Sequence, residues 1–357
     1  MASMKIVDRY IGRNVIGATL TVLVVLLAIF TFFAFIDELE DIGRGTYTLT
    51  LAAAYVGLSL PGLVYQLFPI AALIGALIGL GSLVERNEIA VVRCAGVSKL
   101  RVIAAVMKAG AIFVIAAVLI GELVFPPAEQ HARVLRGDAL EKTVARLGGE
   151  GFWARDGNSY INIREVLPGH RFRDVQIFEF DDDQHLVAAT VAASAEYVDG
   201  QWLLHDIGQT RFVDGGPRAV DLDEARWDST LDPALIGMTA LKPDTLATTD
   251  LLRYVEFAHR NGQNAQTWEY ALWGKLAYPL ATAVMVYLAI PLVLRASRGV
   301  TMGRRILVGA VIGLGFHIVN QAAAHLGVVF GVPAAWSALL PTAVLFVCGT
   351  VLNHRTP

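Results

Sequence analysis

The residue types that most often carry out chemistry occur in this sequence without the spacing of a recognisable catalytic site. Eight histidines and two cysteines, Cys94 and Cys348, are scattered along 357 residues. The sequence has no phosphate-binding G-x-x-x-x-G-K-[ST] loop, no H-E-x-x-H pair and no G-x-S-x-G elbow. His317, Asn320 and Gln321 form a polar cluster in an apolar segment, where such side chains usually form hydrogen bonds between membrane helices. We therefore expect a protein that is not an enzyme and holds no metal or cofactor of its own.

The composition indicates a chain solvated largely by lipid. Hydrophobic residues make up 55% of it and charged residues 17%, and the mean hydropathy is +0.53. A soluble domain has about 25% charged residues. The net charge of −3 argues against a nucleic-acid partner, because it provides no general basic field. The cysteines form neither a disulfide framework nor a metal-ligand pattern.

Six segments are long and apolar enough to cross a membrane, which takes about 20 residues. They lie at about 15–36, 52–84, 102–125, 268–294, 306–327 and 332–352. The first segment is too long for the apolar part of a cleavable signal peptide, so we expect it to be retained.

Basic residues in the short loops predict the orientation of these helices. Lys5 and Arg9 precede the first helix, Arg86 and Lys99 follow the second, and Arg304 follows the fourth. These three regions alternate correctly to share the cytoplasmic side. The N- and C-termini are then expected in the cytoplasm, and the long polar stretch between the third and fourth helices in the bacterial periplasm.

That polar stretch is predicted to be an all-β domain, a sandwich or jelly roll, after a helix at 129–147. The apolar period changes there from helical to alternating, as in 159–164 and 175–180. Asp199-Gly200 between two short strands indicates a hairpin with a type I′ turn. We expect three transmembrane helices in 1–126, the β domain in 127–245, and a connecting helix capped by Thr249 with three more transmembrane helices in 246–357.

The second cytoplasmic loop is the most informative segment. Residues 85–96 read as a short amphipathic helix that Gly96 ends, after which Ser98 caps the third transmembrane helix. Such a helix is typical of an ordinary interfacial element. It is equally what a permease needs in order to receive force from a separate ATPase.

Several motifs resemble the LptF/LptG family of lipopolysaccharide export permeases along nearly the whole chain. They are Asp8-Arg9-Tyr10-Ile11, the Glu-Arg-Asn-Glu loop that runs to Ala95-Gly96, and the six-helix plan with its β insert. Leu77-Ile78-Gly79-Leu80-Gly81 and the segment from Trp153 to Asn158 resemble the LptG branch more than the LptF branch.

The resemblance implies a permease without catalytic activity in the bacterial inner membrane. Its partners would be an LptF-like permease, a dimer of an LptB-like ATPase and an LptC-like bitopic protein. ATP and magnesium would bind to the ATPase alone. The permease pair would extract lipopolysaccharide from the outer leaflet and pass it to a periplasmic bridge of jelly-roll domains.

The resemblance also implies two sets of functional residues. Glu88 is expected to pair with a basic residue of the ATPase, and the surrounding coupling residues are Glu85, Arg86, Ile89, Val92 and Gly96. Arg133, Arg136 and, less strongly, Arg44 are expected to bind the phosphates of lipid A, since arginine can meet phosphate in a bidentate manner. Phe30, Phe33, Phe68 and Phe316 are candidates for a cavity wall around the acyl chains.

The first helix departs from the LptG pattern. Ala34, Glu40 and Asp41 occupy positions that are often lysine in the family. Two explanations are open: divalent ions that bridge these carboxylates to phosphate, or a native lipid A with a different phosphate load.

Two other classes of function compete with an exporter subunit. A membrane-anchored envelope scaffold would use the β domain to bind periplasmic partners. A proton-coupled transporter would need paired acids or histidines deep in the membrane, where the sequence has almost none. Copurification of a soluble ATPase would favour the exporter over both.

Overall fold

The computed structural model describes residues 2–140, 145–146, 151–167, 171–198, 201–213, 216–227, 229, 242–261, 263–295 and 301–355. Six helices within these ranges are long and apolar enough to cross a membrane, which confirms the predicted number. Contacts divide the chain into two units. The helical unit comprises residues 1–40, 53–132 and 266–357, and the β unit comprises residues 41–52 and 133–265.

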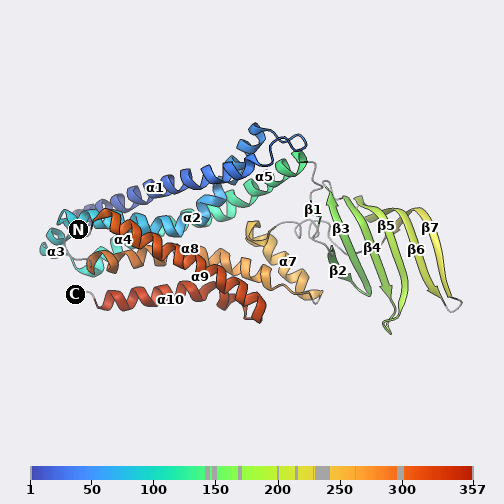
Figure 1. The fold of residues 1–357 in the computed structure, drawn as a ribbon. Coiled ribbons are helices and arrows are strands. Elements are labelled where there is room, and N and C mark those ends of the chain that lie inside the picture. Colours follow the sequence, from blue (N-terminus) through green and yellow to red (C-terminus); the bar gives the residue numbers. More distant parts are fainter. Residues whose placement is uncertain are drawn as a thin grey trace. The chain divides into compact units, whose positions relative to one another are not determined.

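The helical unit is built around a core contributed mainly by four helices, α1 (Ala2–Leu39), α2 (Leu49–Glu85), α4 (Lys99–Leu119) and α8 (Gln266–Arg295). The short helix α3 (Glu88–Cys94) joins α2 to α4, and α9 (Met302–Phe330) and α10 (Ala334–His354) complete the unit (Figure 1). Pro61 and Pro69 lie inside α2, and Pro279 and Pro291 inside α8.

Two glycine pairs allow α2 to approach its neighbours closely. A Cβ on Gly75 would lie 2.3 Å from the Thr19 Cα of α1, and one on Gly79 would lie 2.9 Å from the Val15 Cα. Gly309 and Gly313 of α9 face Ile74 and Ile70 of α2 in the same manner. Both small-residue pairs in the sequence therefore serve packing within the chain.

The third membrane-spanning segment continues beyond its apolar part. α4 passes into a π-helical turn, Ile120–Val124, and then into α5 (Phe125–Ala139). The helix predicted for 129–147 is thus partly wrong: it ends at Ala139, and Ala145–Arg146 is a strand, β1. Pro126 and Pro127 follow the π-helical turn directly, and the helix continues through them.

A buried lysine supports the π-helical turn. Lys275 of α8 donates a hydrogen bond to the Gly121 carbonyl oxygen at 3.0 Å, and its Nζ lies 3.9 Å from the Glu122 carboxylate. The same ammonium lies over the rings of Tyr65 and Phe125. Wider turns leave carbonyls poorly paired, so a cation with both carboxylate and aromatic neighbours stabilises this turn.

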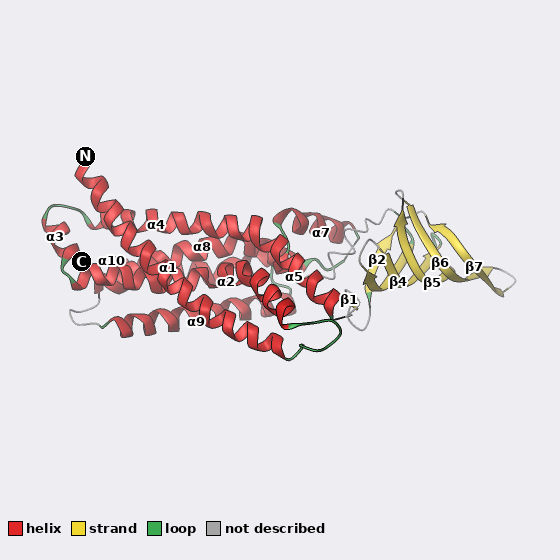
Figure 2. Ribbon diagram, turned by 90° about the horizontal axis from the view of Figure 1, so that it is seen from above, coloured by secondary structure: helices red, strands yellow, loops and turns green. Residues whose placement is uncertain are grey.

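The β unit confirms the prediction of an all-β insert. Besides β1, its described strands are β2 (Phe152–Asp156), β3 (Ser159–Leu167), β4 (Arg171–Phe180), β5 (Leu186–Val198), β6 (Gln201–Val213) and β7 (Gly216–Trp227). Every pair is antiparallel, and from β3 to β7 each strand pairs with the next (Figure 2). β5 and β6 form the predicted hairpin; its Asp199-Gly200 turn lies outside the described residues.

The apolar face of the sheet forms the core of this unit. Ile161 and Ile163 of β3, Ile177 of β4 and Trp202 of β6 are almost fully buried there. Phe257 of α7 (Thr248–Arg260) packs against the same core. The N-cap of α7 is Ala247, so the expected cap at Thr249 is wrong by two residues.

Candidate functional site

α3 is held between two tight turns. Asn87, which precedes it, has a left-handed backbone with φ of 59°, a conformation that asparagine tolerates better than most residues. Gly96 follows it with φ of 88°. The Ser98 side chain then accepts a hydrogen bond from the Arg101 backbone N–H at 3.3 Å and caps α4. The predicted cap and the predicted short helix are both present.

The side chains of α3 divide into an anchoring face and an outward face. Ile89 is 5% exposed and belongs to the helical core, and Val92 is half-buried. Val91 is 67% exposed, and Cys94 is also exposed. Ile89 therefore fixes α3 to its own chain, and the outward face is available to another protein.

Two intramolecular contacts position the acids of this loop. The Tyr10 phenol of α1 lies close to the half-buried Glu88 side chain and interacts with it. The Arg305 guanidinium of α9, 7% exposed, lies 2.9 Å from the Glu85 carboxylate. Gly81 makes room for Arg305, since a Cβ there would lie 2.4 Å from the Arg305 Nη1. The loop is thereby connected to both α1 and α9.

Sequence reasoning missed Tyr10 and Arg305 as partners of this loop. The sequence indicates Tyr10 only as part of the Asp8–Ile11 motif, and Arg305 only as a basic residue beside Arg304, after the fourth membrane segment. An amphipathic loop helix with two acids close to its start is a signal that such partners exist, but it does not say which residues they are.

The loop, the N-terminus and the C-terminus lie at one end of the helical unit (Figures 1 and 2). Lys99 donates a hydrogen bond to the Asn353 carbonyl oxygen at 2.9 Å. Arg101 pairs with Asp8 of α1 at 3.0 Å. The basic residues predicted that the N-terminus, this loop and the region after the fourth helix share one side. The Asp8–Arg101 and Glu85–Arg305 ion pairs agree with that prediction.

The arginines expected to bind phosphate are engaged within the β unit. Asp41 is 8% exposed and pairs with Arg44 and, at 2.6 Å, with the Arg136 Nη2. Arg133 is half-buried and also has an interaction within the chain. A phosphate would have to compete with Asp41 for the N–H donors of Arg44 and Arg136. Asp41 is thus an internal counter-ion, and the described residues contain no group of three acids, histidines or cysteines suited to a metal ion.

The phenylalanine candidates fall into two groups. Phe30 and Phe33 on α1 are 45% and 58% exposed, so both can meet lipid or a partner. Phe316 is half-buried against the helical core. Phe68 is 4% exposed and meets Phe113 edge to face; it supports helix packing and presents no open surface.

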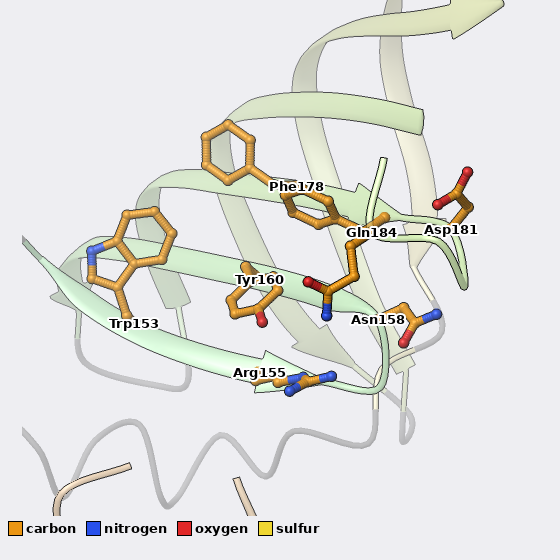
Figure 3. A pocket seen from close by; sticks show the side chains of 8 residues that line it. Trp153, Arg155, Asn158, Tyr160, Phe178, Asp181 and Gln184 are labelled. Atoms are coloured by element: carbon orange, nitrogen blue, oxygen red, sulfur yellow. The ribbon is translucent and has the colours of Figure 1, made fainter. Parts of the chain in front are cut away.

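A pocket of about 430 Å³ lies on the outer face of the β unit (Figure 3). Trp153 stacks on Phe178 with ring centroids 6.0 Å apart, and Arg155 lies over the Tyr160 ring. Trp153, Arg155 and Asn158 come from the segment that resembled the LptG branch. This segment is therefore a surface feature, opposite the apolar core face to which Ala154 belongs.

The fold and the site together define a polytopic helical membrane protein with an inserted β domain and a protruding helical loop at the end that carries both termini. Residues 9–355 match the model of a family described as lipopolysaccharide export system permease LptF/LptG. The chain belongs to this family.

Relatives along nearly the whole chain point to one branch of the family. The LptG permease protein of Haemophilus influenzae is 32% identical over 95% of this chain and 96% of its own length. The LptG protein of Escherichia coli K12 is 32% identical over 99% of both chains. The LptF protein of Escherichia coli K12 is 27% identical over 48% of this chain and 47% of its own. The LptG branch, predicted from two short segments, is supported.

Proposed function

We propose that this chain is the LptG-type permease subunit of a lipopolysaccharide exporter. It extracts lipopolysaccharide from the outer leaflet of the bacterial inner membrane and passes it to a periplasmic bridge, driven by ATP hydrolysis on a separate subunit. The observation that carries the proposal is the likeness to two LptG permeases along at least 95% of the chain.

The end of the helical unit that carries α3 faces the cytoplasm in this proposal, and the β domain faces the periplasm. The basic residues Arg86, Arg93, Lys99 and Arg101 in and beside α3 support this orientation. The cytoplasmic ATPase then meets the outward face of α3, where exposed Val91 adds apolar area to the charges of Arg86 and Arg93.

The partners are an LptF-like permease, an LptB-like ATPase dimer and an LptC-like bitopic protein. Only 11% of the residues are buried in the most apolar part of α1 and in that of α9, whereas 78% are buried in the most apolar part of α2. Two helices with open faces flanking a covered one suit a permease that pairs with a second permease and encloses substrate between them. ATP and magnesium bind to the ATPase in this scheme.

Force transmission begins at Glu88. A basic residue of the ATPase pairs with this carboxylate, which lies close to the Tyr10 phenol of α1. A charge pair at an interface contributes strongly because removal of one partner leaves the other stranded. Movement of α3 is passed to the end of α2, where Glu85 forms an ion pair with Arg305 of α9 at 2.9 Å.

Substrate recognition uses Arg133, Arg136 and Arg44 for phosphate and the exposed faces of Phe30 and Phe33 for acyl chains. Asp41 holds two of these arginines in its own ion pairs. Phosphate therefore replaces the Asp41 carboxylate at these guanidinium groups when substrate binds, and the arginines have a counter-ion before and after binding. This exchange limits phosphate affinity and favours release.

The test is the amount of ATPase that copurifies with Glu88→Ala, compared with wild type and with Glu40→Ala, an exposed acid in the first outer loop. We expect Glu88→Ala to lower the ATPase-to-permease ratio at least about tenfold and to stop ATP-driven release of lipopolysaccharide from proteoliposomes. Tyr10→Phe should give a smaller loss of the same kind.

An unchanged ratio together with normal transport in Glu88→Ala would discard the coupling assignment. If no ATPase copurifies even with wild type, the envelope scaffold becomes the better explanation.

A further inference from the structure

A pocket of about 660 Å³ lies between the N-terminal part of α1 and the first half of α4. Its charged residues are Asp8, Arg9, Arg13 and Lys108, and the rest of its wall is apolar or glycine. It lies entirely within the helical unit, at the end that carries α3, because Asp8 pairs with Arg101 at the start of α4. We call it the α1–α4 pocket.

Positive charge dominates this pocket. The Asp8 carboxylate accepts hydrogen bonds from the Arg101 Nε at 3.2 Å and Nη2 at 3.0 Å, and it also pairs with Lys108. A single acid therefore has two cationic partners before Arg9 and Arg13 are considered. The pocket keeps a clear excess of positive charge after this internal pairing.

Arg9 and Arg13 provide that excess. Both side chains are exposed, and neither has an ion pair or a side-chain hydrogen bond with any residue that the structure describes. Their four-residue spacing places them on one face of α1. Two adjacent guanidinium groups at the end of a membrane helix are suited to a phosphate group, which they can bind in a bidentate manner.

The apolar part of the wall continues toward the middle of the membrane helices. Ile16 on α1 and Ile112 on α4 line the pocket. One turn further on, Leu20 is 51% exposed and Ile115 is 58% exposed, at spacings that keep them on the same faces. The surface thus has a cationic end and an apolar groove, which matches an anionic head group with hydrocarbon chains.

We propose that the α1–α4 pocket binds an anionic phospholipid of the cytoplasmic leaflet. Basic pockets between membrane helices at the cytoplasmic surface are typical binding sites for such head groups. The choice of leaflet depends on the orientation under the proposed function, whereas the head-group chemistry depends on the pocket alone. This lipid is distinct from the exported substrate, which binds from the opposite leaflet.

The experiment is native mass spectrometry of the detergent-purified complex titrated with phosphatidylglycerol or phosphatidylcholine. We expect saturable binding of phosphatidylglycerol that the double variant Arg9→Gln/Arg13→Gln weakens at least about tenfold. Gly12→Leu should also weaken it, because Gly12 lines the pocket and a Cβ there meets no atom within 4 Å, so the helix accepts the side chain that fills the space. Arg304→Gln, an exposed cation of α9 outside the pocket, should bind like wild type.

Two competitors identify the source of the bound phosphate. Inorganic phosphate at millimolar concentration should leave phosphatidylglycerol bound; complete displacement would assign a simple anion site and overturn the proposal. Displacement by an equal concentration of lipopolysaccharide would assign the pocket to substrate and overturn it as well.

Equal binding by wild type and the double variant, or equal binding of the two phospholipids, would also overturn the proposal. The readout needs neither ATP nor transport. A negative result here therefore leaves the proposed function intact, and a failure of ATPase coupling leaves the lipid site intact.

Discussion

At the scale of single residues, Asp41 determines how much positive charge the loop between α1 and α2 presents. Its carboxylate is nearly buried and pairs with Arg44 and Arg136, so it joins the loop to α5 within the β unit. The Thr46 backbone N–H adds a 2.8 Å hydrogen bond to the Ala139 carbonyl oxygen. The loop is thus fixed by one acid and a few backbone bonds.

Asp41→Asn should loosen this loop, because the neutral amide holds the two guanidinium groups less strongly than a carboxylate does. We expect trypsin to cleave after Arg44 several-fold faster in the variant, as measured by the rate at which the full-length band disappears. Glu40→Gln, a change in the exposed acid next to it, is the matched control and should be cleaved like wild type. Equal rates in Asp41→Asn and wild type would show that the ion pairs do not hold the loop.

Tyr254 provides a pH-dependent contribution to the β unit. Burial raises the pKa of its phenol to about 12, above the value of about 10 for an exposed tyrosine. Between these two values the unfolded chain has lost the proton and the folded chain has kept it. The contribution is therefore fully present below pH 10 and declines as the pH rises toward 12.

Tyr254→Phe should reduce the loss of stability between pH 10 and pH 12. The measurement is the apparent unfolding temperature of the full chain in detergent, compared with wild type across this range. Tyr160→Phe, a change in a residue that is 38% exposed, is the matched control. Identical pH dependence in Tyr254→Phe and wild type would show that this phenol does not report on unfolding.

At the scale of elements, α2 depends on glycine for its contact with α1. Gly75→Leu would drive its Cβ to 2.3 Å from the Thr19 backbone, which cannot move aside as a flexible side chain can. We expect overpacking of this kind to destabilise the protein by about 1–3 kcal/mol, seen as a lower unfolding temperature in detergent.

Gly57→Leu is the matched control on the same helix, because a Cβ at Gly57 meets no atom within 4 Å. The better helix propensity of leucine should leave stability unchanged or slightly raised. If both variants lost the same stability, glycine would matter for helix formation at these positions and not for the α1–α2 contact.

At this scale the sequence predicts the parts of a helix that are apolar, because hydropathy is the signal that was used. The sequence predicted all six membrane segments. However, α1 begins at Ala2, well before the apolar run that starts at about residue 15, and its first turns contain the charged residues Lys5, Asp8 and Arg9. Backbone hydrogen bonding carries a helix into water where hydropathy gives no signal. The continuation of α4 into α5 was not predicted for the same reason.

The contacts of the candidate site were less predictable. α3 and the cap at Ser98 follow from local spacing, and both were expected. The Asp41–Arg136 pair joins residues 95 positions apart, and the Tyr10–Glu88 and Arg305–Glu85 contacts join different helices. Such pairs depend on which helices lie side by side, and a single sequence does not reveal which helices are neighbours.

At the scale of the whole molecule, the orientation in the membrane can be read from a natural cysteine. Cys94 is exposed on α3, so in a Cys348→Ser background a membrane-impermeant thiol reagent should label it in inside-out vesicles and not in spheroplasts. Asp182→Cys, in an exposed turn of the β domain, should give the opposite result when Cys94 and Cys348 are both serine. Labelling of Cys94 in intact spheroplasts would invert the topology and remove the cytoplasmic ATPase contact.

The burial of α2 also affects which substitutions the protein can accept during evolution. In its most apolar part 78% of the residues are buried, and it meets α1 and α9 through glycine contacts. Substitutions in α2 must fit several helix surfaces at once, whereas most positions of α1 and α9 face only lipid or another subunit. Substitutions should therefore accumulate in α1 and α9 during evolution. Changes there can adapt the protein to a different membrane without altering the packing of α2.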